Sequence, residues 1–276
     1  MNQFLPSRYS ETVHRLALGI EPLDAQQGRR LNYQIQAAAD AAQLGLPRPP
    51  IERHNSNLFV LRYQRGVTTP IDLRFFDSAT PPYKAERDRR RIVPRRLSIP
   101  LLTLADVENE EKIDKKAYSR RIRRPAFFPG AAYDFSAMTT GLRGKVVRNG
   151  KPMRWARVVA RLDGTSVVVG NAHGDDRGEF LLLINAQVTT GGALPKPLMI
   201  EVSVLGPAVV PTPNPVDLPA LDPLWDLPLE VLSNPGDADP VAGGAVPPPG
   251  YTASVTRVIE FTLGRCLGEE PEFQIP

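Results

Sequence analysis

The chain has 276 residues, of which 42% are hydrophobic and 23% are charged, with a formal net charge of +4. This composition is close to the globular average, which excludes a wholly disordered chain, a collagen-like repeat and a coiled coil. The length exceeds one typical domain, so two units are expected.

The sequence carries no sign of a membrane span or a secretory signal. No stretch approaches about 18 apolar residues, and residues 1 to 8 lack the basic and apolar regions of a signal peptide. The single cysteine, Cys266, cannot form an internal disulfide, which favours a cytoplasmic location. Proline is the outlier at 29 residues, about twice its usual share, and this argues against long helices.

The first half of the chain predicts short strands. Large apolar side chains alternate with smaller or polar ones over residues 16 to 20 and 31 to 35, although Ala37 to Ala42 would also suit a helical turn. Clearer strands are expected at Leu58 to Gln64, Ile71 to Phe76 and Ile92 to Leu101. The polar stretch Val107 to Arg121 suits a helix or an exposed arm. No helices of about 10 to 15 residues separate the strands, so an antiparallel arrangement is favoured over a parallel sheet.

The chain breaks at Pro125 to Gly130, which divides it into units of residues 1–128 and 129–276. In the second unit, Asn149-Gly150 predicts a two-residue hairpin, because both residues tolerate the positive φ of a type I′ turn. Further strands are expected at Ala156 to Leu162, Ser166 to Asn171 and Glu179 to Ile184.

A spaced pattern in this second unit resembles a known family. It reads Gly144-x-Val146-x-x-x-Gly150-x-Pro152-x-x-x-Ala156-x-Val158, followed by Asp176-x-Gly178-x-Phe180. Over residues 139–206 it is similar to the carboxypeptidase regulatory-like domain, a prealbumin-like β-sandwich. The resemblance implies a non-catalytic accessory module. The expected fold class is therefore all-β, with two tandem antiparallel β-sandwich modules, immunoglobulin-like or prealbumin-like, and a long proline-rich arm.

The arm is the insertion at residues 207–250, where proline occurs about every fourth position. Such density favours extended polyproline II and argues against regular strand pairing. A closing strand is then expected at Ser254 to Leu263.

Catalytic chemistry has no visible place in the sequence. The histidines His14, His54 and His173 are isolated from other metal-ligand residues, and Cys266 has no local nucleophile signature. Residues 173 to 176 could be imagined as a base beside paired carboxylates, but a turn explains them better. We therefore predict no enzyme, no cofactor, and neither catalytic nor metal-binding residues.

Charge is unevenly distributed along the chain. Residues 201 to 276 carry −9 and residues 1 to 200 carry +13, largely through the runs Lys84 to Arg96 and Lys112 to Arg124. Arginine pairs bidentately with carboxylates at interfaces, and tryptophan is a frequent interface anchor. The sequence thus predicts a protein interface built from Arg89, Arg90, Arg91, Arg95, Arg96, Arg120, Arg121, Arg123, Arg124 and Trp225.

Two alternatives to a protein interface remain at this point. The arginine runs could bind nucleic acid, although acidic residues interrupt the first run and no aromatic residues interleave with it. The second alternative is a glycan site on a β-sandwich, which would need exposed aromatic platforms.

The leading interpretation is a structural or adaptor subunit of a large multi-protein assembly. Tandem β-sandwiches with charged arms and no targeting signal are similar to accessory components of phage-tail-like contractile injection particles, in the baseplate or the cap. The partners would be other protein subunits, with self-association left open. Assembly would take place in the cytoplasm, with later release in a particle also left open.

Overall fold

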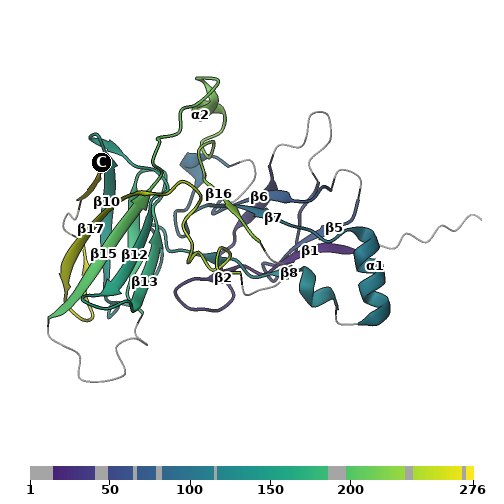
Figure 1. Ribbon diagram of the computed structural model, residues 1–276, viewed down its shortest axis with the longest axis horizontal. Helices are drawn as coiled ribbons and strands as arrows, with labels where there is room; N and C mark the ends of the chain where they lie inside the picture. The colour runs from purple at the N-terminus through teal and green to yellow at the C-terminus, as the bar shows by residue number, and fades with distance from the viewer. Residues whose placement is uncertain are drawn as a thin grey trace, which may run out of the picture.

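The computed structural model is all-β, with 42% strand and 7% helix. It describes residues 15–40, 49–64, 67–78, 83–114, 117–185, 197–233, 239–268 and 272–276. Two bodies of sheet lie side by side along the long axis (Figure 1). No helix in these ranges is long and apolar enough to cross a membrane.

The N-terminal unit contains two four-stranded sheets. The first has the order β4 (Glu52–Arg53), β5 (Phe59–Arg62), β1 (Leu16–Ile20) and β8 (Ile122–Arg123). The second has the order β16 (Leu229–Val231), β7 (Arg95–Ile99), β6 (Ile71–Phe76) and β3 (Gln36–Ala39). One core joins them, with contributions that include Leu18, Phe59, Phe75 and Leu97.

Short elements complete this unit. A two-stranded ladder joins β2 (Leu23–Asp24) to β9 (Ala126–Phe127). The helix α1 (Leu104–Ile113) and the 3-10 turn η2 (Ala117–Arg121) lie between β7 and β8, and η1 (Ala85–Arg87) lies between β6 and β7. The polar stretch Val107 to Arg121, for which the sequence allowed either a helix or an exposed arm, is therefore largely helical.

The C-terminal unit encloses a second core between two sheets. In one sheet, β10 (Gly141–Arg148) pairs with β11 (Lys151–Pro152), β14 (Glu179–Leu183), β18 (Cys266–Leu267) and β19 (Glu272–Ile275). The other sheet has the order β13 (Val168–His173), β12 (Arg157–Leu162), β15 (Leu198–Gly206) and β17 (Ala253–Phe261). Alternation along β15 points Leu198, Ile200, Val202 and Val204 into this core.

The Asn149-Gly150 hairpin forms as predicted. Arg148 pairs with Lys151 across the turn, and the φ angles of Asn149 and Gly150 are 52° and 72°. Positive φ at both positions is the requirement of a type I′ turn, which the right-handed twist of the flanking strands favours.

The strand expected over residues 31 to 35 is wrong in position, since β3 begins at Gln36. Leu31 and Ile35 are buried as their pattern predicts. However, the side-chain amide of Asn57 donates hydrogen bonds to the carbonyls of Leu31 and Tyr33, at 3.1 and 2.7 Å. A side chain from another loop therefore satisfies backbone groups that a ladder would otherwise use.

The proline-rich insertion is not a free arm throughout. A proline-free part of it, Leu229–Val231, forms β16, which pairs in parallel with β7 of the N-terminal unit. Leu232 and Ala242 continue into the N-terminal core. We call the described residues 223–233 and 239–245 the strap. The expected boundary assigned these residues to the second unit alone. Strand pairing needs only a few residues with available N–H groups, and Leu229–Val231 supply them.

Two glycines with positive φ provide a matched test of this fold. A Cβ at Gly178 (φ 73°) would lie 2.5 Å from the carbonyl oxygen of Val146, whereas one at Gly150 (φ 72°) would meet nothing within 4 Å. We expect Gly150→Ala to lower the free energy of unfolding by about 1 to 2 kcal/mol through backbone strain alone. Gly178→Ala should cost more, because a strand must also move. Equal losses in urea unfolding would contradict the close approach.

Candidate interaction surface

The predicted interface arginines mostly face the inside of this chain. Arg95 is fully buried, with 0% of its side chain exposed, on β7 at the junction of the two units. Its guanidinium has five N–H donors, and all of them are used. Two donate to Glu230 of β16, and the others donate to the carbonyls of Ala126, Val241 and Ala242 at 2.5 to 2.8 Å.

Glu230 connects three parts of the molecule. Its carboxylate accepts from Arg95 at 2.7 and 3.1 Å and from Arg157 of β12 at 3.1 Å. Burial alone would raise the pKa of Glu230, but the two guanidinium groups outweigh burial and hold that pKa below its ordinary value. The N-terminal unit, the strap and the C-terminal unit therefore meet at one buried carboxylate. We call Arg95, Glu230 and Arg157 the junction triad.

His173 lies beside the triad at the end of β13. Its ring stacks on Phe128 with centroids 3.8 Å apart and an interplanar angle of 20°. Gly244 has a φ of 70°, and a Cβ there would meet the Phe128 ring at 2.4 Å, so only glycine leaves room for this stack. Burial, together with the charges of Arg157 and Arg95, lowers the pKa of His173 well below 6.5.

Arg90 and Arg91 also bind carboxylates of this chain. Arg90 bridges the units through Asp176 at 2.7 Å and Asp175 at 3.2 Å. Arg91 holds the fully buried Asp77 with two side-chain bonds of 2.8 and 3.0 Å. The desolvated arginine-carboxylate pairs that the sequence suggested are thus present, but here they join parts of one molecule.

Some of the other predicted residues are buried and others are exposed. Arg96 pairs with Asp40, and the buried Arg121 and Arg123 donate to backbone carbonyls. Arg124 pairs with Glu21 at 2.8 Å. Arg89 and Arg120 are exposed, and Trp225 is half-buried. Arg95, Arg121 and Arg123 are buried within this chain and so offer little surface to a partner.

The sequence missed the aromatic side chain that anchors the junction. Trp155 is 2% exposed and packs with Phe76 and Val93 of the N-terminal unit and with Leu224 and Leu227 of the strap. Its indole N–H donates to Asp226 at 2.8 Å. The hydrophobic spacing of Leu224 and Leu227 beside Trp225 was the available signal. The sequence prediction named Trp225, which these leucines flank, and did not name Trp155.

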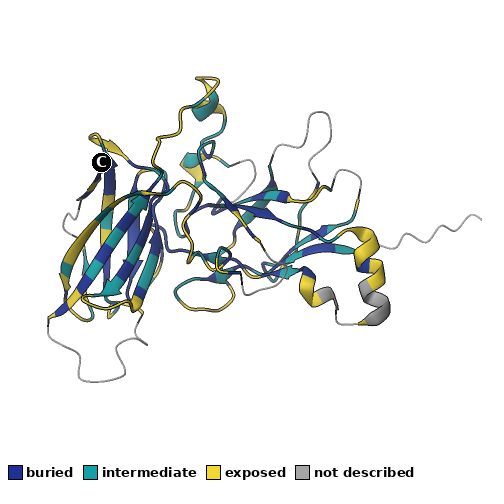
Figure 2. Cartoon of the chain, viewed as in Figure 1, coloured by how far each residue is buried: buried dark blue, intermediate teal, exposed yellow. Residues whose placement is uncertain are grey.

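The outward-facing candidate is the segment 207–222, which leads into the strap. It projects from the body and includes the short helix α2 (Leu218–Leu221) (Figure 1). Large parts of it are exposed (Figure 2). Four aliphatic side chains lie open to solvent, with exposed fractions of 80% for Val209, 57% for Val210, 88% for Val216 and 74% for Leu221. We call this segment the projection.

A hollow of about 340 Å³ lies between the base of the projection and the Asn149-Gly150 hairpin. We call it the hairpin hollow. Arg148 holds its two sides together by donating to the carbonyls of Pro207 and Ala208 at 2.7 and 3.1 Å. Arg154 pairs with Asp226 at 2.8 Å on the strap side. The apolar lining includes Met153, Trp155, Val210, Pro211 and Tyr251.

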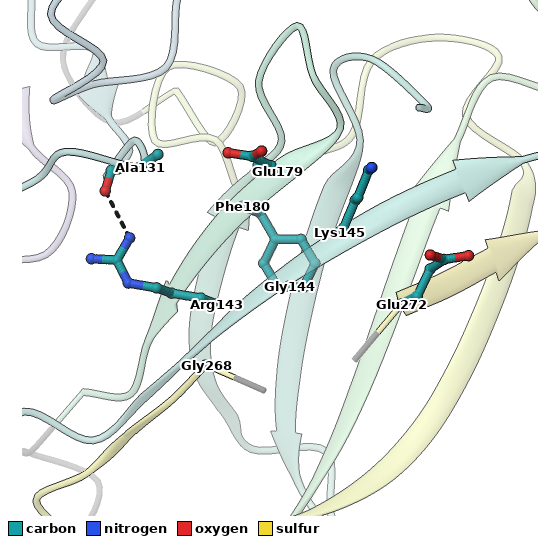
Figure 3. A pocket seen from close by; sticks show the side chains of 8 residues that line it. All are labelled: Ala131, Arg143, Gly144, Lys145, Glu179, Phe180, Gly268 and Glu272. Carbon is teal, nitrogen blue, oxygen red and sulfur yellow. Dashed lines mark hydrogen bonds between the residues drawn. The ribbon is translucent and has the colours of Figure 1, made fainter. Parts of the chain in front are cut away.

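A second hollow, of about 410 Å³, lies over β10 and β14 (Figure 3). Its charges balance, because Arg143 and Lys145 on β10 are matched by Glu179 on β14 and Glu272 on β19. Arg143 donates to the carbonyl of Ala131 at 2.7 Å. The ring of Phe180 belongs to the core beneath and is only 3% exposed. This hollow therefore offers neither an apolar anchor site nor one dominant charge.

No protein-family model matches this chain, and no curated protein matches it.

Glu230 provides the first test of the junction. Glu230→Gln leaves two buried guanidinium groups without their counter-charge, and we expect a loss of about 3 to 5 kcal/mol in the free energy of unfolding. Glu52→Gln is the matched control, because Glu52 pairs with Arg62 at an exposed site and should contribute no more than about 1 kcal/mol. Urea unfolding measures both variants, and similar losses would contradict the role of the triad.

His173 predicts a pH dependence of stability. Its folded-state pKa is depressed, so below about pH 6.5 the unfolded chain binds a proton that the folded chain does not. The contribution of His173 to the free energy of unfolding should be constant above that pH. Below it, stability should fall by up to about 1.4 kcal/mol per pH unit. His173→Leu should flatten the profile between about pH 7.5 and about pH 5.5. An unchanged slope in that variant would show that other groups cause the loss.

Proposed function

We propose that this chain is a non-catalytic structural or adaptor subunit of a multi-protein assembly. It would hold two β-units in a fixed orientation and present the projection to another protein. The proposed setting is the baseplate or cap of a phage-tail-like contractile injection particle. That setting rests on the sequence resemblance described above.

The exposed aliphatic side chains of the projection carry this proposal. Single exposed apolar residues are ordinary on protein surfaces, but contiguous apolar surface marks interaction sites. Here Val209, Val210, Val216 and Leu221 fall within one projecting segment. Prolines at positions 207, 211, 213 and 215 already restrict the backbone, so docking costs less conformational entropy than it would for a flexible loop.

The junction between the units supports the role of a rigid connector. The triad, the Arg90 pairs and the apolar cluster around Trp155 all link the two units. Interfaces held by a few polar contacts allow domain movement, whereas a buried charge network together with apolar packing opposes it. A subunit that sets the distance between neighbours needs this property.

The two alternatives receive less support from the structure. Nucleic acid would need several available guanidinium groups side by side, but Arg90, Arg91, Arg95 and Arg96 are engaged by carboxylates, and Arg89 is the exposed member of the predicted set in that run. A glycan site would need exposed rings, and every aromatic side chain whose burial is described is buried or half-buried.

The projection can be tested by charge insertion. In the native host, the tagged chain should sediment with particles much heavier than the chain itself. Val216→Asp combined with Leu221→Asp should release most of it to the monomer position, because the two carboxylates would have to be desolvated at the contact. Neither side chain belongs to a described core, so the melting temperature should change little.

The control for this experiment is Val258→Asp on β17, where Val258 is also exposed. We expect this variant to sediment with the particles as the unaltered chain does. The proposal fails if the unaltered chain sediments only as a monomer, or if the double variant still sediments with particles.

A further inference from the structure

The hairpin hollow combines an apolar floor with positive charge at its rim. Met153 and Trp155 lie at its base with little exposed surface, and Val210 and Pro211 form the wall on the projection side. Its volume of about 340 Å³ falls at the small end of ligand sites, so it suits a few side chains.

The rim has more positive than negative charge. Arg148, Lys151 and Arg154 line the hollow together with one carboxylate, that of Asp226. Arg154 pairs with Asp226, whereas no described carboxylate forms an ion pair with Arg148 or Lys151. The Arg148 guanidinium is fixed by its bonds to the carbonyls of Pro207 and Ala208, so its charge is held in place without a counter-charge from the described residues. Lys151 is exposed at the turn of the hairpin.

From this combination we infer that the hairpin hollow binds an extended segment of a partner protein, with a large aliphatic side chain in the hollow and carboxylates beside it on the rim. An aliphatic side chain would bury apolar surface against Met153 and Val210. Neighbouring carboxylates would face Arg148 and Lys151. Charge complementarity of this kind favours a negatively charged partner segment over a positively charged one.

The hollow is continuous with the projection, because Val210 belongs to both. The inference therefore rests on the proposed function and specifies the chemistry of the partner at that surface. A segment bound in the hollow would leave Val216 and Leu221 available to a different part of the same partner.

The experiment uses the full chain with ¹³C-labelled methionine methyl groups. The probe is the peptide acetyl-Glu-Glu-Leu-Glu-Glu-amide, and its two matched peptides replace leucine by serine or all glutamates by lysine. Met153 lines the hollow and its methyl group lies against Gly206, next to Pro207 of the hollow, so its signal reports on binding there. The methyl group of Met199, on the outer face of β15, serves as an internal reference. We expect the acidic leucine peptide to shift the Met153 signal in a saturable way, with the Met199 signal unchanged.

Two variants show whether the hollow itself is responsible. Lys151→Glu should weaken binding of the acidic leucine peptide about tenfold, and Val210→Asp should abolish it. The serine and lysine peptides should bind at least tenfold more weakly than the leucine peptide. The inference is overturned if the Met153 signal does not move, if all three peptides bind alike, or if Lys151→Glu binds as the unaltered chain does.

Failure here can be distinguished from failure of the proposed function. If the Lys151→Glu chain still sediments fully with particles while the Val216 and Leu221 double variant does not, the projection is the contact and the hollow is not. If neither variant affects sedimentation, the proposed function fails as well.

Discussion

A buried carboxylate, Glu230, is held between guanidinium groups from two different sheets, and the arrangement of the two units depends on it. Arg95 comes from β7 and Arg157 from β12, and neither charge is exposed to water. Burying one guanidinium without a partner would be strongly unfavourable, so the strap must lie between the units for both to be accommodated. The triad therefore sets the position of the strap. The strap in turn completes the N-terminal sheet and leaves the projection outside.

Local sequence patterns predicted much of the strand content. Ile71 to Phe76 forms a strand with the expected ends, and the Asn149-Gly150 turn has the expected backbone conformation. These features depend on neighbouring residues alone. The interactions that fix β16 join residues 135 positions apart, as in the bond from Arg95 to Glu230, and no local pattern reports them. The expectation that proline prevents pairing applied to the insertion as a whole, yet three residues without proline were sufficient.

The sequence predicted a surface of arginine residues, whereas the outward-facing candidate in the structure is a different part of the chain. The opposite net charges of the two parts of the chain led to the prediction of arginine-carboxylate pairing between molecules. Among ion pairs within the described residues, Arg95 is the only predicted arginine that pairs with a carboxylate of residues 201–276, that of Glu230. However, charge sums contain no information on whether a pair forms within one molecule or between two. The structure uses Arg90, Arg91 and Arg95 within the chain. The proposed outward contact therefore uses aliphatic residues of the projection and the cations around the hairpin hollow. No local sequence pattern reports the hollow, since it forms from segments about 60 residues apart, as the bonds from Arg148 to Pro207 and Ala208 show.

If the junction triad and the cluster around Trp155 join the two units into one body, the units cannot unfold independently. Scanning calorimetry of the intact chain measures this directly through the ratio of calorimetric to van't Hoff enthalpy. The account predicts a single transition with a ratio close to one. Two separated transitions, or a ratio near two, would show that the units unfold separately and would contradict the central role of Glu230.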